Sequence, residues 1–390
     1  MLAAVSCRRR RPEYTWRSKQ DAETHVHIAI VGAGISGLST AWALTKRGHK
    51  VTLIEQGPIP NPLAASGDHH RIIRRAYPAG TYAGAITEAY QAWDELWGDL
   101  GASHYDARGF LCVSREPGDE AEEYLEGLKE GGFPFDMLEP DEVAARYPFI
   151  DPATVRYGYF SPEGGVLHCK HIAAGMADWL RANGADVREN ARVVAVDSVS
   201  GMVALDGGER VAADKIVVTA GAWVTKLYPR LVSTLTTYRT AVAYLDPPDD
   251  LRAAWDTAPV ILDIGGRLDG YIIPPSGGGG LKFGTGMHKE ATDDASKNRA
   301  PHAGEGAEIL KWFSPPMARI DGYKVQQVVT CAYTYTDDER FFALDDARAL
   351  VVSACSGHGY KFGAAVGRRV ADAVESGGIR ALQAWLRQEG

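Results

Sequence analysis

A glycine-rich turn near the start of the chain constrains its fold more than any other feature. The turn reads GAGISG at residues 32–37 and directly follows an apolar run at residues 27–31. Beyond it, apolar residues recur at helical spacing as far as Leu44, and a second apolar run covers residues 51–55. A strand, a glycine turn, a helix and a second strand in this order predict a parallel β-α-β crossover of the Rossmann type.

The spacing of the glycines favours the binding of a dinucleotide. The turn matches G-x-G-x-x-G in the setting that this motif requires, after a strand and at the start of a helix. The glycines let the backbone approach a pyrophosphate, and the free N–H groups of the helix stabilise its charge. Glu55, eighteen residues after Gly37, can accept hydrogen bonds from an adenosine ribose and would repel the 2′-phosphate of NADP. The alternative is a glycine turn that binds nothing.

The rest of the pattern predicts an α/β protein. A chain of 390 residues exceeds a single-core domain, so we expect two interlocked domains or one domain with a large insertion. Helical spacing predicts helices at 82–100, 119–129, 139–147, 171–183 and 364–376. The sequence also predicts a small antiparallel ribbon from 186–196 and 201–211, buried strands at 215–220 and 350–354, and a strand-rich region at 233–329.

Charge and cysteine content argue against several functions. The 50 Asp and Glu residues outnumber the 42 Lys and Arg residues, and a net charge of -8 does not suit nucleic acid or an anionic membrane. A small-molecule ligand is expected instead. Five cysteines without a C-x-x-C pair indicate neither a disulfide framework nor a zinc site, so no metal is expected.

The sequence shows no membrane or export signal. No apolar run approaches the roughly 20 residues of a membrane span. The basic cluster at residues 8–11 is followed by polar residues where a signal peptide would need an apolar stretch. We therefore expect a cytoplasmic protein, and the expected oligomeric state is a monomer or small homo-oligomer. Residues 1–26 are expected to form a disordered basic arm or to result from a start codon placed too far upstream.

Five later segments resemble the monomeric sarcosine oxidase family, within the D-amino-acid-oxidase-like group of FAD enzymes. They are SGDHHRIIR at 66–74, TAGAW at 219–223, GLK at 280–282, CAYT at 331–334 and SGHGYKF at 356–362. The resemblance runs from about residue 27 to residue 375. It implies a glutathione-reductase-like FAD-binding domain made of residues 27–84, 159–230 and 331–390. A substrate domain with a mixed antiparallel sheet is expected from residues 85–158 and 231–330.

The resemblance assigns chemistry to a cysteine and a lysine. Cys331 matches the cysteine that is joined through sulfur to the flavin 8α-methyl carbon in this family, although a free cysteine is usually a small buried apolar residue. Lys282 matches the lysine over the flavin at which family members activate O₂, because a fixed ammonium stabilises the negative charge that develops on oxygen. The alternative for Lys282 is a solvated surface charge.

The resemblance also assigns a substrate site. Arg71 is placed against the flavin, while Arg74 and Lys361 are expected to bind the substrate carboxylate, for which a guanidinium fork is well suited. Tyr271 and Tyr333 match active-site tyrosines, with plain sheet packing as the alternative. For the arginines the alternative is pairing with surface acids. Together, the turn and the resemblance assign contacts with FAD to Gly32, Gly34, Ile35, Ser36, Gly37, Glu55, Ser66, Arg71, Cys331, Gly357, Gly359 and Lys361.

The implied reaction is the oxidation of a secondary or primary amine of an amino acid. Hydride passes to flavin N5, the imine is hydrolysed, and O₂ is reduced to H₂O₂. Two departures put the identity of the amine or N-methyl amino acid in doubt: Gly286 replaces a histidine of sarcosine oxidases, and the loop with His69 and His70 is about one residue longer. The alternatives are a dehydrogenase that passes electrons to a partner protein or quinone, and a binding protein with a non-catalytic flavin.

Overall fold

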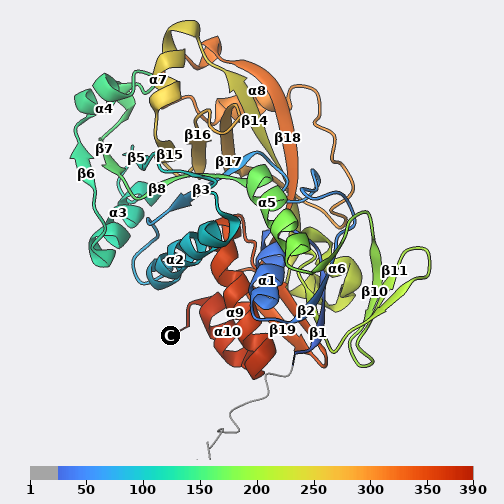
Figure 1. The fold of residues 1–390 in the computed structure, drawn as a ribbon. Coiled ribbons are helices and arrows are strands. Elements are labelled where there is room, and N and C mark those ends of the chain that lie inside the picture. Colours follow the sequence, from blue (N-terminus) through green and yellow to red (C-terminus); the bar gives the residue numbers. More distant parts are fainter. Residues whose placement is uncertain (1–24, 390) are drawn as a thin grey trace, which may run out of the picture.

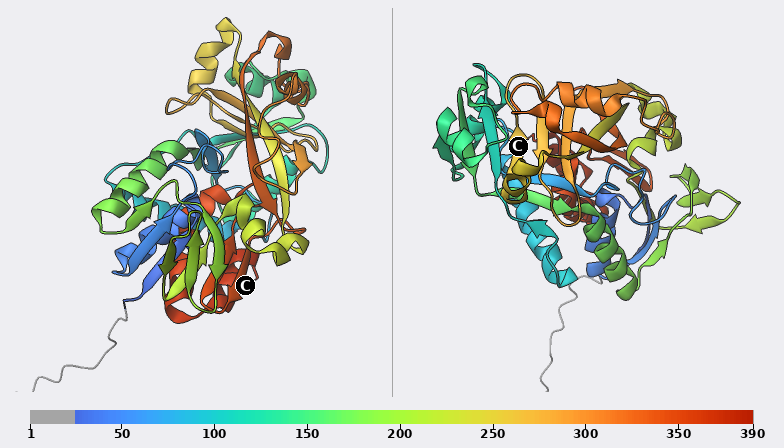
Figure 2. Two further views of the ribbon diagram at one scale, coloured as in Figure 1. Left: turned by 90° about the vertical axis from the view of Figure 1, so that its right-hand side faces the viewer. Right: turned by 90° about the horizontal axis from the view of Figure 1, so that it is seen from above.

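Two large β-sheets with helices packed around them make up the protein. The structure is a computed structural model that describes residues 25–389. A six-stranded, mostly parallel sheet lies in one half of the molecule and an eight-stranded mixed sheet in the other half (Figures 1 and 2). This arrangement confirms the predicted α/β class with a second domain built on a mixed antiparallel sheet. The predicted arm at residues 1–26 lies almost entirely outside the described residues.

The glycine turn belongs to the six-stranded sheet, whose strand order is β19-β20-β13-β1-β2-β9. All neighbours pair in parallel except β19 and β20, which are antiparallel. Helix α1 (Ile35–Lys46) connects β1 to β2, so the predicted crossover is present. The strands are β1 His27–Val31, β2 Lys50–Ile54, β9 Asp186–Arg188, β13 Lys215–Val218, β19 Phe342–Asp346 and β20 Ala349–Ser353.

Strand β1 is apolar throughout because both of its faces are buried. Ile28 and Ile30 pack against helices, whereas Ala29 and Val31 pack against the opposite layer. Alternate residues of a strand point to opposite faces, so a central parallel strand becomes continuously apolar. The helical layer contains α1, α2 Ala83–Leu100, α5 Cys169–Ala182, α9 Gly363–Ser376 and α10 Ile379–Arg387. The layer on the opposite face contains α6 Val224–Leu227 and the ribbon of β10 Val193–Asp197, β11 Met202–Leu205 and β12 Arg210–Ala212.

The eight-stranded sheet has the order β18-β14-β17-β16-β15-β5-β7-β6, in which only β15 and β5 are parallel. Its strands are β5 Phe110–Ser114, β6 Asp136–Leu138, β7 Tyr157–Ser161, β14 Thr236–Asp246, β15 Val260–Asp263, β16 Gly270–Ile273, β17 Leu281–Ala291 and β18 Lys324–Tyr335. Helices α3 Glu120–Gly131, α4 Pro140–Arg146, α7 Arg252–Thr257 and α8 Glu305–Lys311 lie in this half (Figure 1).

A third, small sheet and several short helices complete the fold. Strands β3 (His70–Arg74), β8 (Gly164–His168) and β4 (Tyr105–Asp106) pair antiparallel. Single turns of 3₁₀-helix are η1 Pro152–Thr154, η2 Gly221–Trp223, η3 Pro229–Ser233, η4 Asp249–Leu251, η5 Ile320–Gly322 and η6 Gly359–Phe362.

The predicted helices lie within two residues of those observed, because their ends carry local signals. The Asp119 side chain accepts a hydrogen bond from the backbone N–H of Glu122 at the start of α3, and Glu139 and Glu142 form a capping box at α4. The predicted ribbon at 186–196 was partly wrong. Residues 186–188 join the six-stranded sheet as β9, and only 193–197 enter the ribbon.

Two predicted domain boundaries fall inside strands of the eight-stranded sheet. The boundary at 158/159 cuts β7, and the boundary at 330/331 cuts β18, which pairs with β14 as far as Tyr335. Each strand continues as long as its neighbour offers hydrogen-bond partners, and the family motifs do not mark where that ladder ends. The division of the chain into two domains otherwise stays a prediction.

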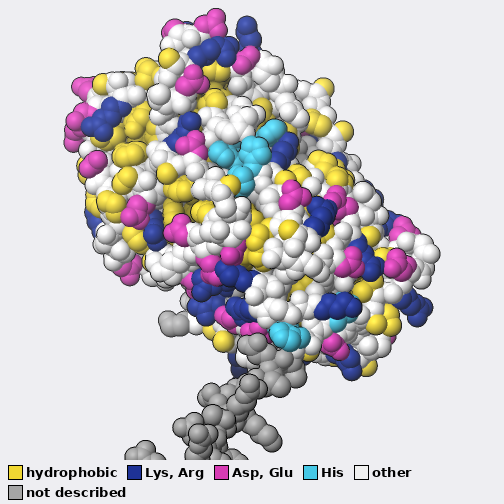
Figure 3. Space-filling view, in the orientation of Figure 1, with side chains coloured by type: hydrophobic (Ala, Val, Ile, Leu, Met, Phe, Trp, Pro, Cys, Tyr) yellow, Lys and Arg dark blue, Asp and Glu magenta, His cyan; other side chains and the backbone are white. Residues whose placement is uncertain are grey.

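On the face drawn in Figure 3, basic and acidic side chains are interspersed. Within residues 25–389, none of the helices combines the length and the apolar character that a membrane crossing needs.

Candidate active site

A first cavity of about 320 Å³ opens at the glycine turn. The turn residues meet the segment before β3 and the loop after β20 here. Its walls include Gly32, Gly34, Ile35, Ser36, Glu55, Ser66, Thr219, Ala220, Ala332, Ser353 and Cys355. The cavity therefore lies at the carboxyl ends of parallel strands, where α/β sheets bind ligands.

The turn has the geometry of a cradle for a pyrophosphate. Gly32 has a φ of +98°, which favours glycine, and a Cβ on Gly37 would lie 1.8 Å from the Gly32 carbonyl oxygen. The close packing at Gly37 brings the start of α1 to the cavity, where Gly34 and Ile35 form part of the wall. The residues present thus fit the dinucleotide part of FAD, through backbone N–H groups and the helix dipole. Gly37 itself shapes the turn and does not line the cavity.

Glu55 lies at the wall of this cavity and is fixed by the turn. Its Oε2 accepts a hydrogen bond from the backbone N–H of Ala33 at 2.7 Å, and its Oε1 accepts one from Asn61 Nδ2 at 2.8 Å. Oε1 also accepts a hydrogen bond from the backbone N–H of Gly57 at 3.1 Å, which uses its second lone pair, whereas Oε2 keeps one lone pair for the ribose hydroxyls that the sequence assigns to Glu55.

A buried ionic cluster joins β3 to the eight-stranded sheet. Lys282 Nζ donates to Asp68 Oδ2 at 2.6 Å, and Arg71 Nη1 donates to the same oxygen at 2.7 Å. The hydroxyl of Tyr244, on β14, donates to Asp68 Oδ1 at 2.6 Å. Lys282 has 0% of its surface exposed, so its interpretation as a solvated surface charge is wrong.

The cluster carries a net positive charge. Burial alone would raise the pKa of Asp68, but the charges of Lys282 and Arg71, with the hydrogen bonds from Lys282 and Tyr244, hold it well below its usual range. One carboxylate thus faces two cations, and one positive charge remains uncompensated beside the fully buried side chain of Lys282. Such a charge suits a reaction in which negative charge develops nearby.

Arg71 also connects this cluster to the two remaining predicted residues of β18. Its Nη2 lies 3.7 Å from the sulfur of Cys331 and donates to the hydroxyl of Tyr333 at 3.3 Å. Cys331 is buried, and its neighbours Ala332 and Tyr333 line the first and the second cavity, respectively. Arg71 therefore lies against buried groups and does not pair with surface acids.

A second cavity of about 500 Å³ lies between β3, the edge of η6 and the eight-stranded sheet. The predicted substrate residues meet here, since Arg71, Arg74, Tyr271, Tyr333, Gly357 and Lys361 all line it. Lys282, Cys331 and Gly359 are buried beside the cavities but line neither. A Cβ on Gly359 would lie 2.0 Å from the carbonyl oxygen of Ala354, so this glycine serves the turn before α9.

Arg74 and Lys361 bring two positive groups to one wall of the second cavity. The Arg74 guanidinium lies 4.2 Å from the ring centre of Tyr77 and 4.7 Å from that of Tyr124. Lys361 Nζ donates to the carbonyl oxygen of His358 at 2.9 Å. Burial, and then the charge of Arg74, lower the pKa of Lys361 well below its ordinary value. A substrate carboxylate at this wall would oppose both effects.

Sequence patterns missed three residues of the site. Asp68 and Tyr244 complete the ionic cluster, and Asp269 lines the second cavity. Asp68 lies inside a segment that carries the family resemblance, but its partner Lys282 is 214 residues away. Asp269 has no sequence signal of its own, because its position depends on the strand beside it.

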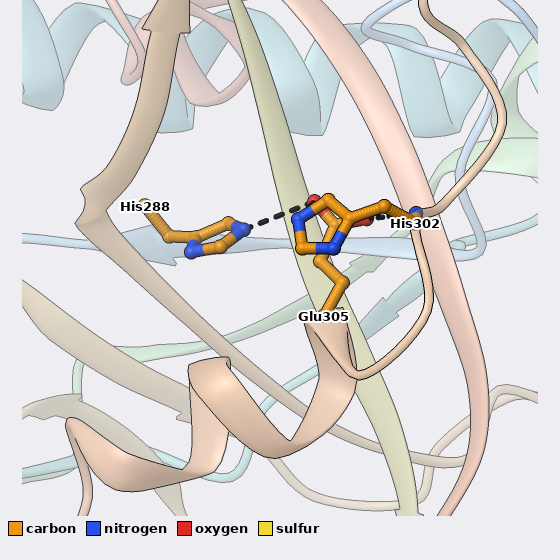
Figure 4. Close-up of side chains that lie close together, drawn as sticks. All are labelled: His288, His302 and Glu305. Carbon is orange, nitrogen blue, oxygen red and sulfur yellow. Dashed lines mark hydrogen bonds and ion pairs between the residues drawn. The ribbon is translucent and has the colours of Figure 1, made fainter.

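His288, His302 and Glu305 form a separate cluster whose nitrogen and oxygen atoms lie close enough to hold a metal ion (Figure 4). Arg239 Nη1 and Nη2 donate to the two oxygens of Glu305 at 2.6 and 2.9 Å, and His288 Nε2 lies 3.0 Å from Oε1. Because the buried carboxylate already holds a guanidinium bidentately, this ion pair accounts for the cluster. Of the five cysteines, the four in the part of the chain that the structure describes are free thiols.

The Glu305 ion pair predicts a pH-dependent stability. Burial would raise the pKa of Glu305, but the hydrogen bonds from Arg239 and His288 outweigh it and lower that pKa to about 2. The pKa of this carboxyl is lower in the folded protein than in the unfolded chain, where it is about 4.3. The ion pair therefore stabilises the fold above about pH 4.3, and this contribution is lost as the pH falls toward 2. We expect Glu305→Gln to lower the free energy of unfolding at pH 7 by about 2–3 kcal/mol.

Urea denaturation of both proteins at pH 7, 4 and 2.5 measures this effect. The difference in the free energy of unfolding between the wild-type protein and Glu305→Gln should become smaller at each lower pH. Asp206→Asn is the control, because Asp206 pairs with Arg192 at the surface and its loss should change stability by less than about 1 kcal/mol. A gap at pH 2.5 as large as that at pH 7 would contradict the prediction.

Known proteins are similar to this chain along most of its length. The family described as "FAD dependent oxidoreductase" (DAO) matches residues 27–373. Monomeric sarcosine oxidase of Bacillus sp. (strain B-0618) is 28% identical over 88% of this chain and 90% of its own length. N-methyl-L-tryptophan oxidase of Yersinia pestis (strain Pestoides F) is 24% identical over 87% and 92%. The crystal structure of a fructosamine oxidase from Aspergillus fumigatus superposes with a TM-score of 0.77 at 18% identity, covering 93% of this chain and 89% of that one.

Proposed function

Because the chain belongs to the DAO family of FAD-dependent oxidoreductases, we propose that it is an oxidase of an amine carried by an amino acid. The observation that carries the proposal is the second cavity, in which Arg74 and Lys361 share one wall with Tyr271 and Tyr333 nearby. A cavity with two cationic groups on one wall suits a carboxylate-bearing substrate. The relatives named as oxidases of sarcosine and of N-methyl-L-tryptophan support the same class of substrate.

Held at the first cavity, FAD would supply the acceptor for the hydride from the carbon next to nitrogen, and O₂ would take up the two electrons, so that H₂O₂ and a hydrolysable imine would result. The chain's own residues bind and orient. Arg74 and Lys361 hold the carboxylate, which fixes the position of the C–H bond, a positioning effect. Tyr271 and Tyr333 enclose the substrate and exclude water. Lys282, held by Asp68 at 2.6 Å, provides a fixed positive charge for the reaction with O₂.

Cys331 is proposed to attach the flavin covalently. The attachment requires the sulfur to lie next to the flavin, and the neighbouring residue Ala332 lines the first cavity. Arg71 lies 3.7 Å from this sulfur. We expect acid precipitation of the wild-type protein to leave yellow colour in the pellet, and that of Cys331→Ser to release the colour into the supernatant.

Cys355 provides the matched control for the attachment, since it lines the first cavity but does not match the flavin-linking cysteine of the family. The variant Cys355→Ser should keep its colour in the pellet. Release of all colour from the wild-type protein would exclude the bond without excluding FAD.

An anaerobic screen tests the proposed reaction. The FAD-loaded protein is mixed with amino acids and N-methyl amino acids, and the loss of flavin absorbance is followed. The proposal expects one or more of them to bleach the flavin and expects rapid recovery of absorbance when air is admitted. Recovery that is slow in air would instead support a dehydrogenase with a protein or quinone acceptor. Absence of bleaching by every amine would favour a flavin without a catalytic role.

A further inference from the structure

One face of strand β17 is built to admit side chains from its neighbour β16. Residues 282, 284 and 286 point to the same face, and they are a lysine followed by two glycines. Tyr271 pairs with Gly284, and a Cβ on Gly284 would lie 2.5 Å from the Tyr271 hydroxyl. In the same way, a Cβ on Gly286 would lie 1.8 Å from Asp269 Oδ2. The two glycines therefore make room for Tyr271 and for Asp269.

The resulting row of side chains runs along the second cavity. Lys282 Nζ lies 5.9 Å from the ring centre of Tyr271, and Asp269 lies two residues before Tyr271, at the end of the turn that leads into β16. Asp269 and Gly286 both line the cavity, so the carboxylate borders the space for the substrate at a distance from Lys282.

Asp269 is a carboxylate without a partner. Within residues 25–389 it forms no ion pair or side-chain hydrogen bond, although Lys289 and Arg74 lie near enough to affect it. Asp269 is an exposed residue at the cavity wall, where desolvation, and then the negative charges of Glu120 and Glu339, raise its pKa to about 7. Its φ of +41° is rare for an L-residue, and such conformations often persist where they serve a site.

We propose that Asp269, in the space that Gly286 leaves open, binds a second positive charge of the substrate. This assignment rests on the proposed function. The substrate would be an amino acid with a basic group, such as a primary ammonium, several bonds from the reacting amine. Its carboxylate would meet Arg74 and Lys361, and its distal cation would meet Asp269. Binding would give this unpaired carboxylate at the cavity wall a charge-assisted contact.

Two ligands that cannot be oxidised at the α-carbon test the assignment. Racemic α-methyl-lysine and α-methyl-norleucine have the same chain length, lack an α C–H bond, and differ in a terminal ammonium group. Their dissociation constants for the FAD-loaded protein are measured by calorimetry. We expect the wild-type protein to bind α-methyl-lysine about 10–100-fold more tightly, where each tenfold corresponds to about 1.4 kcal/mol. Asp269→Asn should reduce this preference to within about 2-fold.

Two further variants make the test specific. Gly286→Ala keeps the negative charge but places a Cβ where the carboxylate lies, so it should also reduce the preference. Asp338→Asn is the matched control, because Asp338 borders the same cavity but already pairs with Arg387 at 3.2 Å. It should keep the preference.

Several results would overturn the assignment. These are equal binding of both ligands by the wild-type protein, binding of neither, or a preference that survives both Asp269→Asn and Gly286→Ala. An equal loss of affinity for both ligands in Asp269→Asn would place Asp269 at the α-amine and would also overturn it. The wild-type protein could prefer α-methyl-lysine and Asp269→Asn could lose that preference, while lysine and the other amines fail to bleach the flavin. In that case the proposed function fails and the cation site stands.

Discussion

Replacing Asp68 by asparagine is expected to lower the free energy of unfolding by about 3–5 kcal/mol. The substitution leaves the charges of Lys282 and Arg71 close together, without their shared carboxylate, in a region where Lys282 has no exposed surface. Removing one partner of a buried ionic cluster is far more damaging than removing a surface pair, because an uncompensated charge stays buried. The midpoint of urea denaturation at pH 7, followed by tryptophan fluorescence, measures the loss.

Tyr244→Phe is the control for this prediction. It removes the hydroxyl that donates to Asp68 Oδ1 at 2.6 Å and leaves every charge in place. A hydrogen bond to a charged group contributes about 1.5–3 kcal/mol, so this variant should be destabilised less than Asp68→Asn. If the two variants unfold at the same urea concentration, the charge of Asp68 is not what holds the cluster together.

Replacing Lys282 by methionine is expected to slow the reaction of the reduced flavin with O₂ by roughly 100–1000-fold, the effect of removing one preorganised electrostatic contact. The side chain is fixed by Asp68 and carries part of the uncompensated charge of the cluster. Reduction by substrate in the absence of air should change only a few-fold, because Lys282 does not line the substrate cavity. Stopped-flow absorbance separates the two half-reactions.

The charge-conserving variant Lys282→Arg distinguishes charge from shape in this experiment. It should react with O₂ faster than Lys282→Met, even if its longer side chain disturbs the contact with Asp68. Reoxidation of Lys282→Met within about threefold of the wild-type rate would show that the charge at this position does not serve O₂, since the electrostatic contribution expected is far larger.

The sequence was most informative where the signals are local. The β-α-β unit at residues 27–54 could be predicted because its strands, glycines and helix follow one another within a single supersecondary unit. The helices could be predicted for the same reason, since caps such as Asp119 lie next to the residues that they satisfy. The resemblance to the sarcosine oxidase family, which the family comparison confirms, extended the prediction of the fold to nearly the whole chain.

The contacts between distant strands could not be predicted in this way. Asp68 and Lys282 are 214 residues apart, and no periodicity relates them. The departure at Gly286 was visible in the sequence, but the side chain that occupies the space comes from Asp269 in the turn before the adjacent strand β16. Strand register decides such contacts, and register depends on the whole sheet.

The order of strands in the six-stranded sheet also bears on how the protein is made. Strand β20 at Ala349–Ser353 pairs with β13, and Val352, Ser353, Ala354 and Cys355 form part of the first cavity. A nascent chain emerges from its N-terminus, so the glycine turn at residues 32–37 leaves the ribosome long before residues 352–355, which form another part of the cavity wall. Capture of the flavin therefore falls at the end of biosynthesis, and fragments that stop before residue 349 lack part of the holding site.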